Sequence, residues 1–173
     1  MIPLKFVAGG QSYCFDGKKE REGDELLVSD IKGLENANNL VISSDAFEKA
    51  MSEDKSQAKA VADICKHMAL CHSVIIDPET QTYNSTSPDE LALVEGAKTL
   101  GYEFKARNSD GEITILMDQL EEKYLLHNVF EFNSDRKRMS VVLQDLSLDQ
   151  ERNNKIIILC KGADSIVEKL LSD

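Results

Sequence analysis

Residues 87–107, which read SPDELALVEGAKTLGYEFKAR, contain the point at which the sequence changes from a helical to an extended pattern. Ser87 is a favourable N-cap residue, and Glu90 stands three residues after it, which is the spacing of a capping box. Gly101 suits the left-handed conformation that commonly follows the last turn of a helix. Residues 102–107 then read as a strand. This stretch therefore predicts a helix that ends before Gly101 and a strand directly after it.

The sequence on either side predicts helices early in the chain and consecutive strands later. Residues 2–16, with Gly9 and Gly10 between apolar segments, predict a β-hairpin, and the polar residues 16–39 predict a surface excursion. Because consecutive strands follow the helices, the fold class is α+β with a largely antiparallel sheet. The predicted elements are helices at 52–71, 87–100 and 164–171 and strands at 102–107, 112–116, 124–132, 139–146 and 155–160.

Composition is that of an ordinary folded protein and limits the range of partners. The 173 residues are 42% hydrophobic and 29% charged, which suits one domain over residues 1–173. The formal charge of -11 disfavours nucleic acid as a partner, because clustered Lys and Arg side chains hold the phosphate backbone. An anionic ligand would need a local cluster of positive charge.

Cysteine usage and hydropathy predict the compartment. The four cysteines include no CxxC pair, which favours free thiols in a reducing environment. The chain opens with no secretory signal pattern and has no apolar run near the roughly 20 residues that cross a bilayer. We therefore expect a cytosolic chain without a membrane segment of its own.

Two familiar kinds of ligand site fit the sequence poorly. Residues 96–99, GAKT, resemble the end of a P-loop, but an extra residue separates the glycine from the lysine and the segment lies inside a predicted helix. A zinc alternative rests on four side chains that are close in sequence: Cys65, His67, Cys71 and His72. They lack the paired spacing of such sites, and Cys65 falls on the apolar face of its helix. We therefore expect neither a P-loop nor a metal centre.

Two other segments carry candidate ligand-binding residues. Residues 131–140, EFNSDRKRMS, place an aromatic side chain close to a compact basic run at the end of a predicted strand. An exposed Phe132 can stack on a heteroaromatic base, and Lys137 can supply charge for phosphates, but a core aromatic followed by a basic turn explains the same residues. Lys161 ends a later strand beside a glycine that allows close approach. The alternative interpretation is that Lys161 is a solvated lysine that precedes a helix cap formed by Asp164.

Five segments form a series along the chain: CHS at 71–73, SPDELALV at 87–94, LGYEF at 100–104, FNSDRKRMS at 132–140 and KGAD at 161–164. Taken together they resemble the nucleotide-binding (N) domain of type IV P-type ATPases, the lipid flippases. Residues 1–17 are similar to the strands that follow the phosphorylation motif in that family. The resemblance implies a twisted, mainly antiparallel sheet of six or seven strands flanked by helical hairpins.

The resemblance also implies a ligand and the residues that bind it. ATP would stack its adenine on Phe132, with Lys161 beside the base and ribose. Ser134 and Lys137 match positions along the triphosphate, and Glu90 matches an acidic residue that hydrogen-bonds near the adenine amino group. Because Glu90 is also the predicted partner in the capping box, these two roles compete. In the parent protein, Mg²⁺ would accompany ATP.

Finally, the resemblance implies a larger parent protein. The family's phosphorylation sequence Asp-Lys-Thr-Gly-Thr, its magnesium-binding carboxylates and its membrane helices do not occur in these residues, and a further nucleotide-contacting arginine would lie beyond Asp173. Because phosphoryl transfer needs a nucleophile and a metal clamp, we expect binding of ATP without hydrolysis. The phosphorylation and actuator domains of the parent would be partners at the cytosolic face of a membrane, and a phospholipid would be its substrate. The alternatives are a cation-transporting P-type ATPase as parent, or a stand-alone interaction module that binds no nucleotide.

Overall fold

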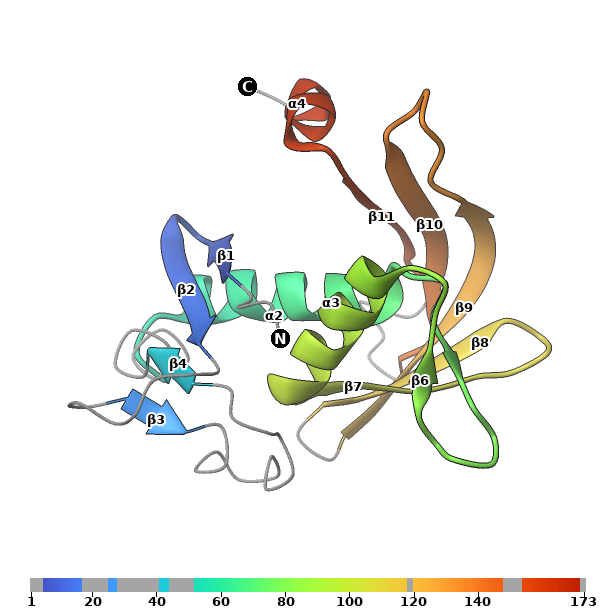
Figure 1. Ribbon diagram of the computed structural model, residues 1–173, viewed down its shortest axis with the longest axis horizontal. Helices are drawn as coiled ribbons and strands as arrows, with labels where there is room; N and C mark the ends of the chain where they lie inside the picture. The colour runs from blue at the N-terminus through green and yellow to red at the C-terminus, as the bar shows by residue number, and fades with distance from the viewer. Residues whose placement is uncertain are drawn as a thin grey trace.

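The computed structural model contains a five-stranded sheet, a four-stranded sheet near the N-terminus and a two-stranded hairpin (Figure 1). Its helices include α2 (Lys55–Leu70), α3 (Pro88–Thr99) and α4 (Asp164–Val167). The residues that it describes are 5–16, 25–27, 41–43, 52–117, 120–147 and 154–171. None of the helices in these ranges combines the length and the apolar character that crossing a bilayer requires.

The central sheet is an antiparallel meander with the order β11-β10-β9-β8-β7. Its strands are β7 (Tyr102–Arg107), β8 (Glu112–Met117), β9 (Leu120–Phe130), β10 (Arg138–Asp145) and β11 (Ile156–Gly162). The α+β class and the mainly antiparallel sheet are confirmed. In the described part of the chain this sheet has five strands, whereas the resemblance implied six or seven.

The N-terminal sheet has the order β1-β2-β4-β3. Its strands are β1 (Lys5–Ala8), β2 (Gln11–Asp16), β3 (Glu25–Leu27) and β4 (Val41–Ser43). The first two form the predicted β-hairpin, whose turn residues Gly9 and Gly10 have positive φ angles of 55° and 79°, as glycine readily allows. The surface excursion predicted for residues 16–39 lies mostly outside the described residues.

Helices α2 (Lys55–Leu70) and α3 (Pro88–Thr99) confirm the two main predicted helices. The start of α2 is fixed by Asp54, whose carboxylate accepts hydrogen bonds from the backbone N–H groups of Ser56 at 2.9 Å and Gln57 at 3.0 Å. The shorter elements are β5 (Ile75–Ile76), β6 (Tyr83–Asn84), α4 (Asp164–Val167) and the 3-10 helix η2 (Glu168–Leu170), the last two in the place of the predicted short helix.

The end of α3 and the start of the central sheet lie where the sequence predicted them. Gly101 has a φ angle of 87°, and β7 begins at the next residue. This short connection holds α3 against β7, with which it packs. The first turn of α3 then lies toward the end of the sheet where β11 meets α4 (Figure 1).

The hydrophobic core lies between the central sheet and the two long helices. Helices α2 and α3 contact each other and β7, and α2 also contacts β8 (Figure 1). Cys65 is fully buried on the apolar face of α2, as its position in the helical pattern predicted. The apolar residues with no exposed surface are Cys65, Ala69, Val74, Val94, Ala97, Ile113, Ile115 and Leu143.

Candidate functional site

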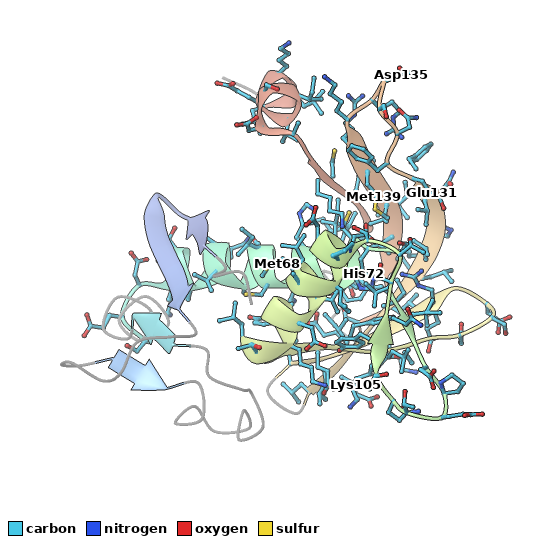
Figure 2. All side chains as sticks on the ribbon, viewed as in Figure 1. Met68, His72, Lys105, Glu131, Asp135 and Met139 are labelled. Carbon is cyan, nitrogen blue, oxygen red and sulfur yellow. The ribbon has the colours of Figure 1, made fainter. Side chains whose placement is uncertain are left out.

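The connection between β9 and β10, residues 131–137, carries the aromatic and basic residues singled out above, and we name it the basic loop. Its turn is fixed by Asn133, whose Oδ1 accepts a hydrogen bond from the Arg136 N–H at 2.7 Å and whose carbonyl accepts one from the Lys137 N–H at 2.8 Å. Figure 2 shows Asp135 at the tip of this loop. Phe132 is 61% exposed, so the alternative of a core aromatic at this position is wrong.

Strand pairing places Lys161 beside the basic loop. Arg138, at the start of β10, is opposite Gly162 in β11, and the Ala163 N–H donates to the carbonyl of Lys137 at 3.0 Å. A Cβ atom at Gly162 would lie 2.5 Å from that carbonyl oxygen. Only glycine therefore allows the two segments to approach so closely. This agrees with the close approach that the sequence suggested for the residue after Lys161.

Lys161 forms an ion pair with Glu90 in the first turn of α3. Its Nζ lies 2.8 Å from Oε1 of Glu90, and the two side chains are 23% and 12% exposed, respectively. In the β10–β11 ladder Lys161 is opposite Met139, which is buried, so Lys161 projects from the face of the sheet that the helices cover. The alternative of a freely solvated lysine is therefore wrong. The pair joins the edge strand to α3.

Ser73 completes what we name the acceptor network, consisting of Ser73, Glu90 and Lys161. The other carboxylate oxygen of Glu90, Oε2, accepts hydrogen bonds from the backbone N–H of Ser73 at 2.9 Å and from its hydroxyl at 2.6 Å. Burial by itself raises the pKa of Glu90, but the hydrogen bonds from Lys161 and Ser73 outweigh it, so this pKa lies below its usual value. Glu90 is therefore an ionised acceptor at neutral pH.

The predicted capping box forms only in part. The Oγ of Ser87 accepts a hydrogen bond from the Glu90 N–H at 3.3 Å, as a cap requires. The N–H of Ser87, however, donates to Oγ of Ser85 at 3.1 Å and not to Glu90. The prediction that the Glu90 side chain completes a capping box is wrong, because Lys161 and Ser73 provide a cation and two donors instead. Of its two competing roles, Glu90 has the one in the acceptor network.

A buried cluster holds the backbone next to Ser73. The His72 Nε2–H donates to the Ala69 carbonyl at 2.8 Å, and its Nδ1 accepts from the Val74 N–H at 3.1 Å. The imidazole packs edge-on against Phe104, with ring centroids 4.6 Å apart, and Arg107 Nη2 donates to the His72 carbonyl at 3.0 Å. Burial lowers the pKa of His72 to about 4. The ring is thus neutral and fixes the direction of the chain at residue 73.

The side chains considered above as zinc ligands do not show the features of a metal site. Burial raises the pKa of Cys65 to about 12 and that of Cys71 to about 11, so neither is a reactive thiolate. Burial, and then the charge of Lys161, lower the pKa of His67, whose Nε2 has no hydrogen-bond partner within the described ranges. No group of three or more metal-ligating side chains occurs among the described residues, which gives the zinc alternative no support.

Comparison with known proteins connects this arrangement to a family. Residues 60–172 match the family model described as "P-type ATPase, cytoplasmic domain N". The match includes both the acceptor network and the basic loop. The chain belongs to the P-type ATPase N-domain family. This N domain is therefore homologous to a cytoplasmic part of membrane ATPases.

Individual relatives place the N domain close to lipid-transporting members. It is 37% identical over 117 residues to phospholipid-transporting ATPase DNF1 of Saccharomyces cerevisiae, covering 62% of the chain and 7% of that protein. It is 30% identical over 168 residues to DNF2 of the same organism, covering 88% and 10%. Probable phospholipid-transporting ATPase 12 of Arabidopsis thaliana is 36% identical over 128 residues, covering 69% and 10%. The chain thus spans about a tenth or less of the length of these type IV relatives.

Within the N domain the five predicted site residues fall into two groups. Glu90 and Lys161 contact each other directly. Phe132, Ser134 and Lys137 share the basic loop, and no hydrogen bond or ion pair among the described residues joins their side chains to the Glu90–Lys161 pair. The role of Ser73 was missed, although its segment, CHS at 71–73, was one of the five used for the resemblance. The sequence shows only a polar residue shortly after a predicted helix, which does not by itself indicate a contact with Glu90.

Proposed function

We propose that this N domain binds ATP, with the adenine stacked on Phe132 and with Lys161 beside the base and ribose. Glu90 accepts a hydrogen bond from the adenine amino group, and Ser134 and Lys137 lie along the triphosphate. The observation that carries the proposal is the close backbone contact between the basic loop and the end of β11, the strand that contains Lys161. There the Ala163 N–H donates to the carbonyl of Lys137 at 3.0 Å. It brings a stacking surface, a cation and an ionised acceptor to one end of the sheet.

The same groups predict weak binding. One aromatic stack contributes about 1 to 3 kcal/mol, and exposed charge contacts contribute about 0 to 1 kcal/mol each. The sum corresponds to a dissociation constant on the order of millimolar. The net charge of -11 repels an anionic ligand at long range, so the local cations of the basic loop have to outweigh it at short range. Weak binding suits a domain that delivers its ligand and releases it.

Magnesium would come with the nucleotide. The described residues contain no group of three or more His, Cys, Asp or Glu side chains that could hold a metal ion. The residues present therefore do not fit a protein-bound Mg²⁺ site. We propose that the phosphates of ATP carry the ion and that none of the steps assigned to these residues depends on it.

The parent protein is proposed from the relatives. Because the curated proteins that match are named as phospholipid-transporting ATPases, we propose that residues 1–173 form one nucleotide-binding domain of such a protein, at the cytosolic face of a membrane. The domain presents the γ-phosphate of ATP to the phosphorylation domain of the parent, whose actuator domain resets the cycle. The phospholipid contacts only the membrane part of the parent.

Titration with ATP tests the proposal. We expect backbone amide signals around Phe132, Lys137 and Lys161 to shift progressively over millimolar concentrations of ATP, and the purified chain to release no phosphate. CTP, whose smaller base stacks less, serves as the matched ligand and should produce weaker shifts at Phe132. Absence of shifts at several millimolar ATP would reject nucleotide binding and favour an interaction module. Metal-dependent turnover by the chain alone would favour an independent hydrolase.

A further inference from the structure

The carboxylate of Glu90 is almost fully committed before any ligand binds. A carboxylate has about four positions at which it accepts hydrogen bonds, two on each oxygen. Ser73 occupies both positions on Oε2, through its N–H at 2.9 Å and its hydroxyl at 2.6 Å. Lys161 occupies one position on Oε1, at 2.8 Å. Among the described residues, one acceptor position on Oε1 therefore remains, next to the ammonium group of Lys161.

We propose that Ser73 is a positioning residue for base recognition: by holding Oε2, it directs the single remaining acceptor position of Glu90 toward a base that presents an amino group. The proposal rests on the proposed function, because it assumes that a nucleotide base reaches Glu90. It deepens that function by naming the residue that makes the site selective. A base with no amino group at that point leaves the ionised acceptor without a donor, which is costly in a shielded site.

The position of Ser73 is itself fixed by hydrogen bonds of the neighbouring residues. Ser73 lies between His72 and Val74. The His72 Nδ1 accepts a hydrogen bond from the Val74 N–H at 3.1 Å, which closes this turn of the backbone. The His72 carbonyl accepts from Arg107 on β7 at 3.0 Å. Ser73 therefore does not adapt to Glu90. It presents two donors from a segment that the sheet and α2 hold in place, and Glu90 takes its orientation from them.

The charge of the network favours the same function. The side chain of Glu90 is 12% exposed and that of Lys161 is 23% exposed, so neither group is free to rotate into solvent. If Ser73 did not hold Oε2, the carboxylate could turn both oxygens toward the ammonium group of Lys161, as Glu122 does toward Lys66 at 3.1 and 2.8 Å. Such a pair would leave the acceptor positions directed at the lysine and not at a ligand. Ser73 thus keeps an acceptor position of Glu90 available to a ligand. Without it, the carboxylate would serve only in the ion pair with Lys161.

The experiment compares ATP with purine riboside triphosphate, which has the same ring and phosphates but no amino group. We expect the unmodified chain to bind ATP about tenfold more tightly, as the loss of one hydrogen bond to a charged acceptor predicts. Ser73→Ala removes the hydroxyl donor at 2.6 Å but keeps the backbone N–H donor at 2.9 Å. It should therefore reduce the preference to about threefold, because one bond holds Oε2 in place of two. Ser73→Thr keeps the hydroxyl and should restore the preference. Ser109→Ala, at an exposed serine in the turn between β7 and β8, is the control that should change nothing.

The pKa of Glu90, measured by carboxyl NMR, is a second readout. A purely structural role of Ser73 would leave this pKa unchanged. Because Ser73 helps to keep this pKa below its usual value, Ser73→Ala should raise it and Ser73→Thr should lower it again. If Ser73→Ala does not fold, Ser73→Cys replaces it, because the thiol is a weak donor of similar size. The expected result for Ser73→Cys is a preference for ATP between those of Ser73→Ala and the unmodified chain.

The outcomes separate this inference from the proposed function. If the unmodified chain binds neither nucleotide at several millimolar, the proposed function fails and the inference with it. If it binds both nucleotides equally, ATP binding stands and selection through Glu90 is overturned. If Ser73→Ala or Ser73→Cys keeps the full preference for ATP, selection stands and the positioning role of the Ser73 side chain is overturned.

Discussion

The acceptor network and the basic loop lie at the same end of the central sheet but are held in different ways. Ser73 follows α2, Glu90 lies in α3 and Lys161 lies in β11. Ser73 is exposed, but the side chains of Glu90 and Lys161 are shielded from solvent, and Glu90 binds the other two directly. The basic loop is held by the two hydrogen bonds that Asn133 accepts within the turn and by the contact of Lys137 with Ala163. Its aromatic ring, Phe132, projects largely into solvent.

This difference indicates which properties each region controls. A shielded network of charges that depends on a packed support couples ligand selectivity to the stability of the fold. An exposed loop contributes stacking area and charge that can change without affecting the core. Mutations of the buried residues that support the acceptor network should therefore mainly lower the stability of the fold. Mutations in the basic loop should change only the affinity for the ligand.

Two phenylalanines give the largest test of this contrast. Phe104 is 1% exposed and supports His72, so Phe104→Ala should lower the free energy of unfolding by about 3 to 5 kcal/mol, as cavity formation in a core does. Phe132 is 61% exposed, so Phe132→Ala should change it by no more than about 0.5 kcal/mol. Urea unfolding followed by circular dichroism measures both. Equal losses would mean that the basic loop is part of the folding core.

The pH dependence of stability gives the next largest effect. His72 has a pKa of about 4 in the folded chain and about 6.5 when unfolded. A group whose folded pKa is depressed contributes stability above its unfolded pKa and loses it as pH falls toward the folded pKa. The free energy of unfolding should therefore fall by an amount on the order of 2 to 3 kcal/mol between pH 6.5 and pH 4.

A matched pair of histidine variants isolates this effect. His72→Asn should flatten most of the slope above pH 4.5, where carboxylates such as Glu90 remain ionised, at the cost of lower stability at neutral pH. Some slope should persist, because the pKa of His67 is also lowered, mainly by burial. His127→Asn changes an exposed ring that contacts Gln144 and should leave the slope in place. An unchanged slope in His72→Asn would exclude the buried imidazole as its source.

Local sequence patterns were sufficient for the elements that form the site. Strand β7 occupies the predicted residues 102–107, and Gly101 ends α3 as its position suggested. Both depend on interactions within a few residues, which a pattern of side-chain types captures. Local patterns also indicated a capping role for Glu90 and a candidate binding role for Lys161, but no local pattern contains their direct contact across 71 residues of sequence.

The same distinction explains what the sequence did not predict. The capping box around Ser87 is a local pattern, and it predicted a local partner for Glu90 that a contact from another element replaced. The role of Ser73 depends on the fold of His72 and Arg107 beneath it, so it could not be read from a serine after a helix. The exposure of Phe132 was likewise open, because an aromatic residue at a strand end suits either a core or a ligand.

Within the basic loop, stacking should contribute more to ATP affinity than charge does. Phe132→Ala removes a stack of about 1 to 3 kcal/mol, whereas Lys137→Ala removes an exposed charge contact of no more than about 1 kcal/mol. Salt distinguishes the two losses of ATP affinity, because a higher ionic strength screens the contribution of Lys137 and not that of the Phe132 ring. We therefore expect ATP titrations at low and high salt to give a constant loss for Phe132→Ala and a shrinking loss for Lys137→Ala. Equal losses, or a loss for Phe132→Ala that shrinks with salt, would place the base elsewhere and leave the loop only an electrostatic role.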